Sequence, residues 1–174
     1  ILAGQGVARY RRDGAIRYLP YHRLFERIEE IEVPGTGVFD AYANRDSVKY
    51  LKLYHLEEVD TLYRATLRFP GYCRMWNAFV QMGMTDGSYR LADSKGMTYR
   101  DFTFSFVHAQ PGLSDRESLA FFLEEFQDGE VLRKLEHLDL LSDRKIELEN
   151  ASPAEILEAI LLEKWVFEPT DVDM

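Results

Sequence analysis

Three arginines in two neighbouring segments carry the side chains best suited to bind an anion. Arg45 lies in a polar turn, and Arg64 and Arg68 lie in a strand-like run farther along the chain. Side chains of an extended strand alternate between its two faces, so Arg64, Thr66 and Arg68 share one face. A guanidinium presents forked N–H donors that hold two oxygens at once. The pattern therefore predicts a site for carboxylates or phosphates.

The elements around these arginines would have to position them. The opposite face of the strand is apolar and suited to cover a core; it carries Tyr63, Ala65, Leu67 and Phe69. The turn around Arg45 contains Asn44, Asp46 and Ser47, and Asp46 or Ser47 could cap a helix running from Ser47 to about Tyr54. Free N–H groups at that helix start would favour an anion. The alternative is that all three arginines are solvated surface charges.

The amino-acid composition excludes several classes of binding partner. The 174 residues carry a net charge of −9, so an acidic surface would repel nucleic acid, and no apolar run is long enough to span a membrane. An arginine site must therefore be local. The single cysteine, Cys73, excludes an internal disulfide and indicates a reducing compartment, which we take to be the cytoplasm. The four histidines show no metal-ligand spacing, so no metal site is expected.

The first part of the chain has strand-like patterns separated by turn signals. Glycine and proline mark turns at 12–14 and 34–37. The expected strands are 7–11, 15–19, 25–33 as an edge strand, 38–42, and 59–69 as the longest.

The rest of the chain changes to a helical period after Pro70-Gly71. Ser114 and Ser152 each precede a glutamate by three residues, which is the pattern of a capping box. The expected helices are 72–82, 98–107, one that begins after Ser114, 129–141 and 152–166.

Strands grouped first and helices second predict an α+β fold. Residues 1–70 would form a mostly antiparallel or mixed sheet, and residues 71–166 a helical half packed beside it. The chain begins at Ile1 without methionine and ends soon after an apolar stretch, so we expect a domain excised from a longer protein.

Two motifs give the chain a family resemblance. Asn44-Arg45-Asp46-Ser47, a short helix rich in lysine and tyrosine, and Arg64-Ala65-Thr66-Leu67-Arg68-Phe69 resemble Pro-Asn-Arg-Asp-Ser and Arg-Gly-Thr-Leu-Arg-Tyr of the saccharopine dehydrogenase C-terminal domain, in particular of the NADP-dependent, glutamate-forming enzymes. Further similar stretches are Trp76-Asn77, Gly83-Met84-Thr85-Asp86, Leu135-Glu136, Leu140-Leu141-Ser142-Asp143 and Leu161-Leu162-Glu163-Lys164-Trp165.

The resemblance implies a role in lysine metabolism. The family oxidises saccharopine reversibly, passing hydride to NADP and giving glutamate and aminoadipate semialdehyde, and saccharopine carries three carboxylates. By resemblance, the substrate-binding residues are Arg45, Thr66, Leu67 (mainly through its backbone) and Arg68, with Asn44, Asp46, Ser47 and Arg64 supporting them.

The resemblance also implies what this chain lacks. The nucleotide-binding loop and the acid–base groups belong to the family's Rossmann portion, which is absent here. The catalytic residues are therefore unknown, and the chain alone should bind no cofactor and be inactive. We expect it to serve substrate binding and dimerisation in a homodimer.

Two departures bear on the substrate. Ala43 replaces the usual proline, and Ala65 replaces the usual glycine, whose absence could change or exclude the ligand. Two alternatives therefore remain: a carboxynorspermidine- or homospermidine-type relative acting on polyamines, and a non-catalytic interaction domain.

Overall fold

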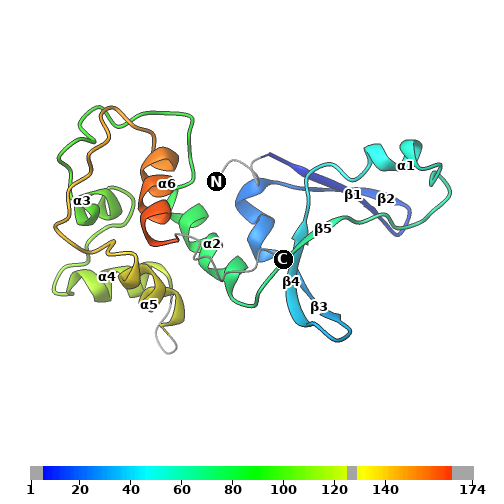
Figure 1. Cartoon of the computed structure of the whole chain (residues 1–174), viewed down its shortest axis with the longest axis horizontal. Helices are drawn as coiled ribbons and strands as arrows, with labels where there is room; N and C mark the ends of the chain where they lie inside the picture. Colours follow the sequence, from blue (N-terminus) through cyan, green and yellow to red (C-terminus); the bar gives the residue numbers. More distant parts are fainter. Residues whose placement is uncertain (1–5, 125–128, 166–174) are drawn as a thin grey trace. The chain divides into compact units, whose positions relative to one another are not determined.

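The computed structural model describes residues 6–124 and 129–165. The chain divides into two compact units, with the boundary between Gln81 and Met82 (Figure 1). The strands lie in the first unit and most of the helices in the second, which confirms the α+β class. No helix within the described ranges is both long and apolar enough to cross a membrane.

The first unit begins with an antiparallel hairpin of β1 (Ala8–Arg12) and β2 (Ala15–Leu19). Its turn places Asp13 and Gly14 at φ values of 52° and 74°. A two-residue hairpin turn of this kind needs positive φ at both central positions, which glycine and aspartate adopt at low cost. The hairpin predicted from the sequence is confirmed.

A second antiparallel sheet has the strand order β3-β4-β5. It contains β3 (Ile28–Val33), β4 (Gly37–Ala43) and β5 (Ala65–Arg68). The edge position of β3 and the turn before Gly37 agree with the sequence prediction. The fold therefore has two small sheets rather than one.

The long strand predicted over 59–69 is wrong, because only Ala65–Arg68 pairs with β4. The preceding residues bond to the first hairpin instead. Leu62 exchanges two backbone hydrogen bonds with Arg11, and the Asp60 carbonyl accepts the Gly14 N–H at 2.9 Å. Tertiary pairing with β1 thus ends the strand early.

The strand predicted over 25–33 is also too long. Residues Tyr21–Glu26 form a 3₁₀ helix, η2, that follows Pro20, and β3 begins only at Ile28. Phe25 is buried in this helix, with its ring 4.9 Å from that of Tyr42. Burial of Phe25 against the sheet outweighs the local strand pattern.

Two helices complete the first unit: α1 (Lys49–Leu53) and α2 (Tyr72–Met82), which matches its prediction. Cys73, Trp76 and Phe79 of α2 are buried in the core. Burial, with a smaller contribution from Asp40, raises the pKa of the Cys73 thiol to about 12, so it stays protonated and serves packing.

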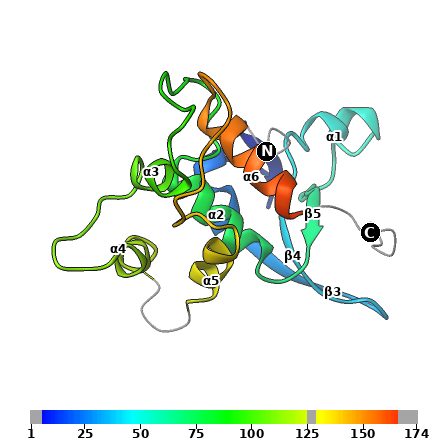
Figure 2. The ribbon, with the colours of Figure 1, turned by 60° about the vertical axis from the view of Figure 1, so that its left-hand side comes forward.

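The second unit contains four helices of the described chain, α3 to α6 (Figure 2). They confirm the predicted helices with shorter bounds: α3 (Tyr99–Phe104), α4 (Asp115–Phe122), α5 (Glu130–His137) and α6 (Pro153–Lys164). Val166, the last residue of the predicted 152–166 helix, lies outside the described residues. The capping boxes at Ser114 and Ser152 are both formed, and Thr98 begins α3 with a third.

The capping box of α6 predicts a pH-dependent stability. Hydrogen bonds from Ser152 hold the pKa of Glu155 below its ordinary value of 4.5. A carboxylate with a lowered folded-state pKa stabilises the fold above 4.5, and this contribution disappears as the pH falls through the folded-state pKa. We expect Glu155→Gln to lower the melting temperature at neutral pH and to match the unsubstituted chain at about pH 3. An equal difference at both pH values would contradict this origin.

Candidate anion-binding site

The first unit contains a cavity of about 340 Å³ that brings the predicted arginines together. Its cationic lining residues are Arg45, Lys49, Arg64 and Arg68. The neutral lining residues come from the N-terminal segment, η2, β4, α1 and β5, and they are Gly6, Val7, Ala8, Leu24, Tyr42, Ala43, Asn44, Tyr50 and Thr66. The residues that were predicted to share one face of the strand therefore line one pocket.

The pocket carries local positive charge in a chain of net charge −9. None of its described lining residues is acidic. Within the described part of the chain, Lys49, Arg64 and Arg68 form no ion pair with a carboxylate. Like charges this close repel one another, and an anion in the pocket would relieve that repulsion.

The turn that carries Arg45 is fixed by its neighbours. The Asn44 N–H donates to the Arg64 carbonyl at 2.8 Å, and the Arg64 N–H donates to the Ser47 hydroxyl at 3.2 Å. The Arg9 N–H donates to the Arg45 carbonyl at 2.9 Å. Arg45 has a φ of 46°, a left-handed conformation that costs an ordinary residue about 1–2 kcal/mol. The surrounding bonds hold the turn in this conformation, which aims Arg45 at the pocket.

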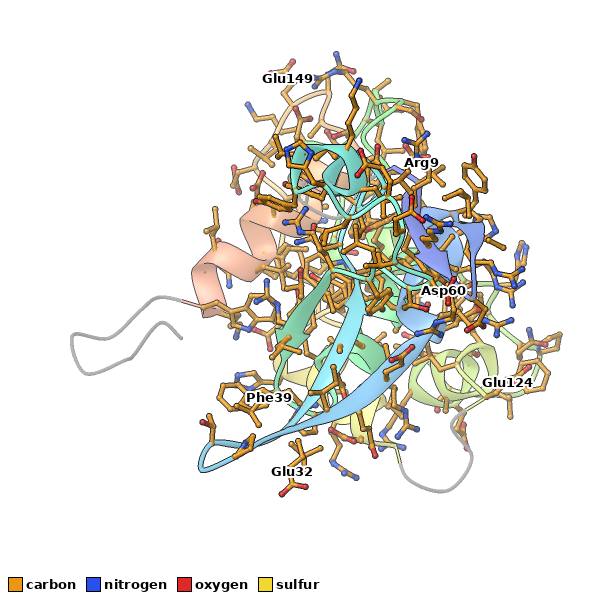
Figure 3. The ribbon with its side chains drawn as sticks, turned by 90° about the vertical axis from the view of Figure 1, so that its right-hand side faces the viewer. Arg9, Glu32, Phe39, Asp60, Glu124 and Glu149 are labelled. Atoms are coloured by element: carbon orange, nitrogen blue, oxygen red, sulfur yellow. The ribbon has the colours of Figure 1, made fainter. Side chains whose placement is uncertain are left out.

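Asp46 supports the turn from outside the pocket. Its carboxylate accepts two hydrogen bonds from Arg9, at 2.7 and 3.2 Å, and one from the Val48 N–H at 3.0 Å. Burial alone would raise the pKa of Asp46, but the bonds from Arg9 and Val48 outweigh burial and lower it. Figure 3 shows the labelled Arg9 on β1. The ion pair therefore joins the first hairpin to the turn.

The short helix begins later than predicted, and its predicted capping is confirmed only in part. Helix α1 begins at Lys49 rather than Ser47, and its N-cap residue Val48 makes no side-chain cap. The Asp46 carboxylate accepts the backbone N–H of Val48, the residue directly before the helix. The Ser47 hydroxyl instead accepts the backbone N–H of Arg64. Because α1 is only five residues long, its N-terminus adds little to the charge of the pocket.

Each strand arginine lies over an aromatic ring. The Arg64 Cζ is 4.2 Å from the ring centroid of Tyr50 on α1, and the Arg68 Cζ is 5.2 Å from that of Tyr72 on α2. Burial raises the pKa of Tyr72 despite the opposing effect of Arg68, so its phenol stays neutral and leaves the Arg68 charge uncompensated. Cation–π contacts hold both guanidinium groups, and a guanidinium has five N–H donors, so Arg68 retains donors for an anion beside its long bond to the Leu67 carbonyl.

The two central residues of β5 have different positions. Thr66 lines the pocket beside Tyr42, its partner on β4, whereas Leu67 does not line it and has a 39% exposed side chain. The Leu67 carbonyl accepts a long, 3.5 Å hydrogen bond from Arg68. Leu67 therefore supports the arginine from the strand backbone and does not face the cavity.

The methyl group of Ala65 does not line the pocket. Alternation along β5 places it on the face opposite Thr66, where it pairs with Ala43. Ala65 itself is therefore not part of the pocket wall, although its cross-strand neighbour on the same face is. Ala43 does line the pocket and is buried.

The sequence reasoning missed several lining residues. Lys49 and Tyr50 were noted only as part of a helix, and their orientation depends on where α1 begins. Proximity to Arg45 in the sequence was the one signal available for them. Leu24 and Val7 also line the pocket, but the sequence around them has no motif that indicates a binding site.

The bonds around Ser47 lead to a stability prediction. Its side chain is 1% exposed, and its removal would leave the Arg64 N–H without a hydrogen-bond partner. We expect Ser47→Ala to lower the free energy of unfolding by about 1–3 kcal/mol, the cost of an unsatisfied buried donor. Urea unfolding measures this, with Thr36→Ala in the exposed turn before β4 as the control. Equal stability of the two variants would mean that the hydroxyl does not fix the turn.

A family model and the curated relatives of the chain all indicate the same protein family. The family model described as the saccharopine dehydrogenase C-terminal domain matches residues 1–174. A curated relative from Saccharomyces cerevisiae, saccharopine dehydrogenase (NADP(+), L-glutamate-forming), is 27% identical over all of this chain and 40% of its own length. Mitochondrial alpha-aminoadipic semialdehyde synthase from Bos taurus is 30% identical over 81% of this chain and 15% of its own length.

A solved structure shares the fold. The apo, histidine-tagged saccharopine dehydrogenase (L-Glu forming) from Saccharomyces cerevisiae superposes with a TM-score of 0.78 at 27% identity. The match covers 96% of this chain and 38% of that chain. The chain thus spans less than half the length of the relatives that it matches.

Proposed function

Because the chain belongs to the saccharopine dehydrogenase C-terminal domain family, we propose that it is the substrate-binding domain of an NADP-dependent dehydrogenase that oxidises saccharopine. The single observation that carries the proposal is the pocket in which Arg45, Thr66 and Arg68 meet with no described acidic residue in the lining. Saccharopine carries three carboxylates, and forked guanidinium donors suit them. Arg45 and Arg68 would hold carboxylates, and Thr66 would donate its hydroxyl.

The reaction itself would require parts outside this chain. NADP, bound by a Rossmann portion, would accept the hydride, and the catalytic acid–base groups would lie in that portion. The chain alone is proposed to be inactive and to bind no cofactor. A strand followed by Gly-x-Gly-x-x-Gly in the sequence upstream of Ile1 would support this, and a full-length protein without such a fingerprint would contradict it.

The activity is tested with the full-length protein. We expect saccharopine to pass a hydride to NADP⁺, and water to hydrolyse the resulting imine to glutamate and aminoadipate semialdehyde, both measured as products. A carboxylated polyamine should not replace saccharopine, because its amines would meet the cationic lining of the pocket. Turnover of the polyamine alone would favour the polyamine relative, and absence of any binding would favour an interaction domain.

Assembly and compartment are part of the same proposal. We propose a homodimer, to be measured by analytical ultracentrifugation of the full-length protein. The lone, buried Cys73 fits a reducing compartment, and we propose the cytoplasm. A monomer at micromolar concentration, or a protein that fractionates with an organelle, would contradict these two points.

The position of Ala65 gives a further expected result. Because its methyl group does not line the pocket, Ala65→Gly should leave the Kd for saccharopine within about twofold, since no hydrogen bond to a charged group is lost. The substitution should cost about 0.5–1 kcal/mol of stability, as glycine does within a strand. Calorimetry and urea unfolding measure the two quantities. A large gain in affinity with glycine would mean that the methyl group does restrict the ligand.

A further inference from the structure

Arg64, directly before β5, and Arg68, its last residue, lie against aromatic rings from different helices. Arg64 and Arg68 are four residues apart, which corresponds to roughly 13 Å between Cα atoms in an extended chain. The Arg64 guanidinium lies over Tyr50 of α1, whereas that of Arg68 lies over Tyr72 of α2. Two separately held donors of this kind suit two separate anionic groups better than one.

Arg64 is held through both its backbone and its side chain. Its backbone N–H and carbonyl are bonded to Ser47 and Asn44, and its guanidinium lies over the Tyr50 ring. The Tyr50 ring also stacks on that of Tyr54, four residues later, at a centroid distance of 5.5 Å and an interplanar angle of 14°. Ordered partners on the main chain and the side chain reduce the entropy that Arg64 would lose on binding a ligand.

Lys49 adds a second cation at the same end of the pocket. Its Nζ lies 5.1 Å from the Tyr50 ring centroid, and Lys49, Tyr50 and Arg64 all line the cavity. The cationic groups of Lys49 and Arg64 therefore both lie next to the Tyr50 ring. That arrangement is costly without an anion, because the ring cannot neutralise either charge.

We propose that Tyr50, by holding Arg64 beside Lys49, forms a second anion-binding point opposite Arg68, so that the pocket selects elongated acids with a negative group at each end. This rests on the proposed function, and it adds Tyr50 as a positioning residue and Lys49 as the cation that acts together with the motif residue Arg64. The guanidinium face rests on the ring while its N–H edge holds the second carboxylate.

The test uses the full-length protein and two simple carboxylic acids as ligands. Its result does not depend on whether saccharopine is the substrate. Suberate is a linear acid with a carboxylate at each end, and octanoate has the same chain with one carboxylate. Calorimetric titration gives the preference of the protein for suberate over octanoate. We expect a preference for suberate that falls about fivefold in Tyr50→Leu and about tenfold in Arg64→Gln, on the scale of a cation–π contact and of a charge-assisted hydrogen bond.

Three controls separate positioning from a general defect. Tyr50→Phe keeps the ring and should retain the preference within about twofold. Thermal unfolding reports whether the variants stay folded. In the double variant Tyr50→Leu/Arg64→Gln the loss should equal that of Arg64→Gln alone, because a ring without its arginine has nothing to position.

The possible results distinguish the proposed role of Tyr50 from the proposed binding of saccharopine. Additive losses in the double variant, equal losses for suberate and octanoate, or no loss in Tyr50→Leu would overturn the role of Tyr50. Suberate binding that depends on Tyr50, without any binding of saccharopine, would support the second anion point and overturn the proposed substrate. Failure of the unsubstituted protein to bind either suberate or saccharopine would overturn both.

Discussion

Arg68→Gln is expected to weaken saccharopine binding by the full-length protein about 10- to 100-fold, because hydrogen bonds to charged groups contribute about 1.5–3 kcal/mol. Arg68 lines the pocket, lies over Tyr72, and has no carboxylate partner among the described residues. Its charge is therefore available to a ligand. Arg45→Ala should have an effect of similar size. Isothermal titration calorimetry measures both.

A matched control lies on the first hairpin. Arg17 of β2 is exposed and does not line the pocket, so Arg17→Gln removes the same charge elsewhere on the unit. It should leave the Kd within about twofold, since surface charges farther than a Debye length are screened. The melting temperatures of all three variants should stay close to that of the unsubstituted protein. A weakening as large with Arg17→Gln, or a large loss of stability with Arg68→Gln, would contradict the proposed role of Arg68.

Trp76→Ala is expected to have the largest effect on stability. Its side chain is 7% exposed and packs against Phe79, Phe25 and Tyr72, with ring centroids 5.8, 6.4 and 5.6 Å away. Its indole N–H also donates to the Tyr21 hydroxyl at 3.4 Å. Removal of a buried tryptophan costs about 3–5 kcal/mol. Urea unfolding of the 174-residue chain, followed by circular dichroism, measures this loss.

The second tryptophan of the chain is the control for the first. Trp165, at the end of α6, is 48% exposed, so Trp165→Ala should cost well under half as much. Trp76→Phe should recover part of the lost stability, because an aromatic ring can still pack on Tyr72. If the two alanine variants were equally stable, the core of the first unit would not be centred on Trp76.

Elements that are determined by residues next to one another in the sequence were predicted correctly. Ser152 as N-cap, Pro153 at the first helical position and Glu155 three residues after the cap led to α6 in the observed position. The hairpin at Asp13-Gly14 follows in the same way from its turn residues. These elements depend on neighbours in the sequence, and the periodic pattern of α2 is equally local.

Two strand predictions failed because distant parts of the chain decided the outcome. The 59–69 strand was shortened because Leu62 pairs with Arg11, about fifty residues away in the sequence. η2 formed where Phe25 could be buried. The same limit applies to the site. The alternation expected along the predicted strand placed Arg64 and Arg68 on one face, but nothing in the sequence said that Tyr50 would lie under Arg64.

A crystal structure of the full-length protein with bound saccharopine would show whether the pocket holds the substrate. We expect carboxylate oxygens within hydrogen-bonding distance, about 2.7–3.2 Å, of the Arg45 and Arg68 guanidinium groups and the Thr66 hydroxyl. Saccharopine bound elsewhere, with water alone on these arginines, would contradict it.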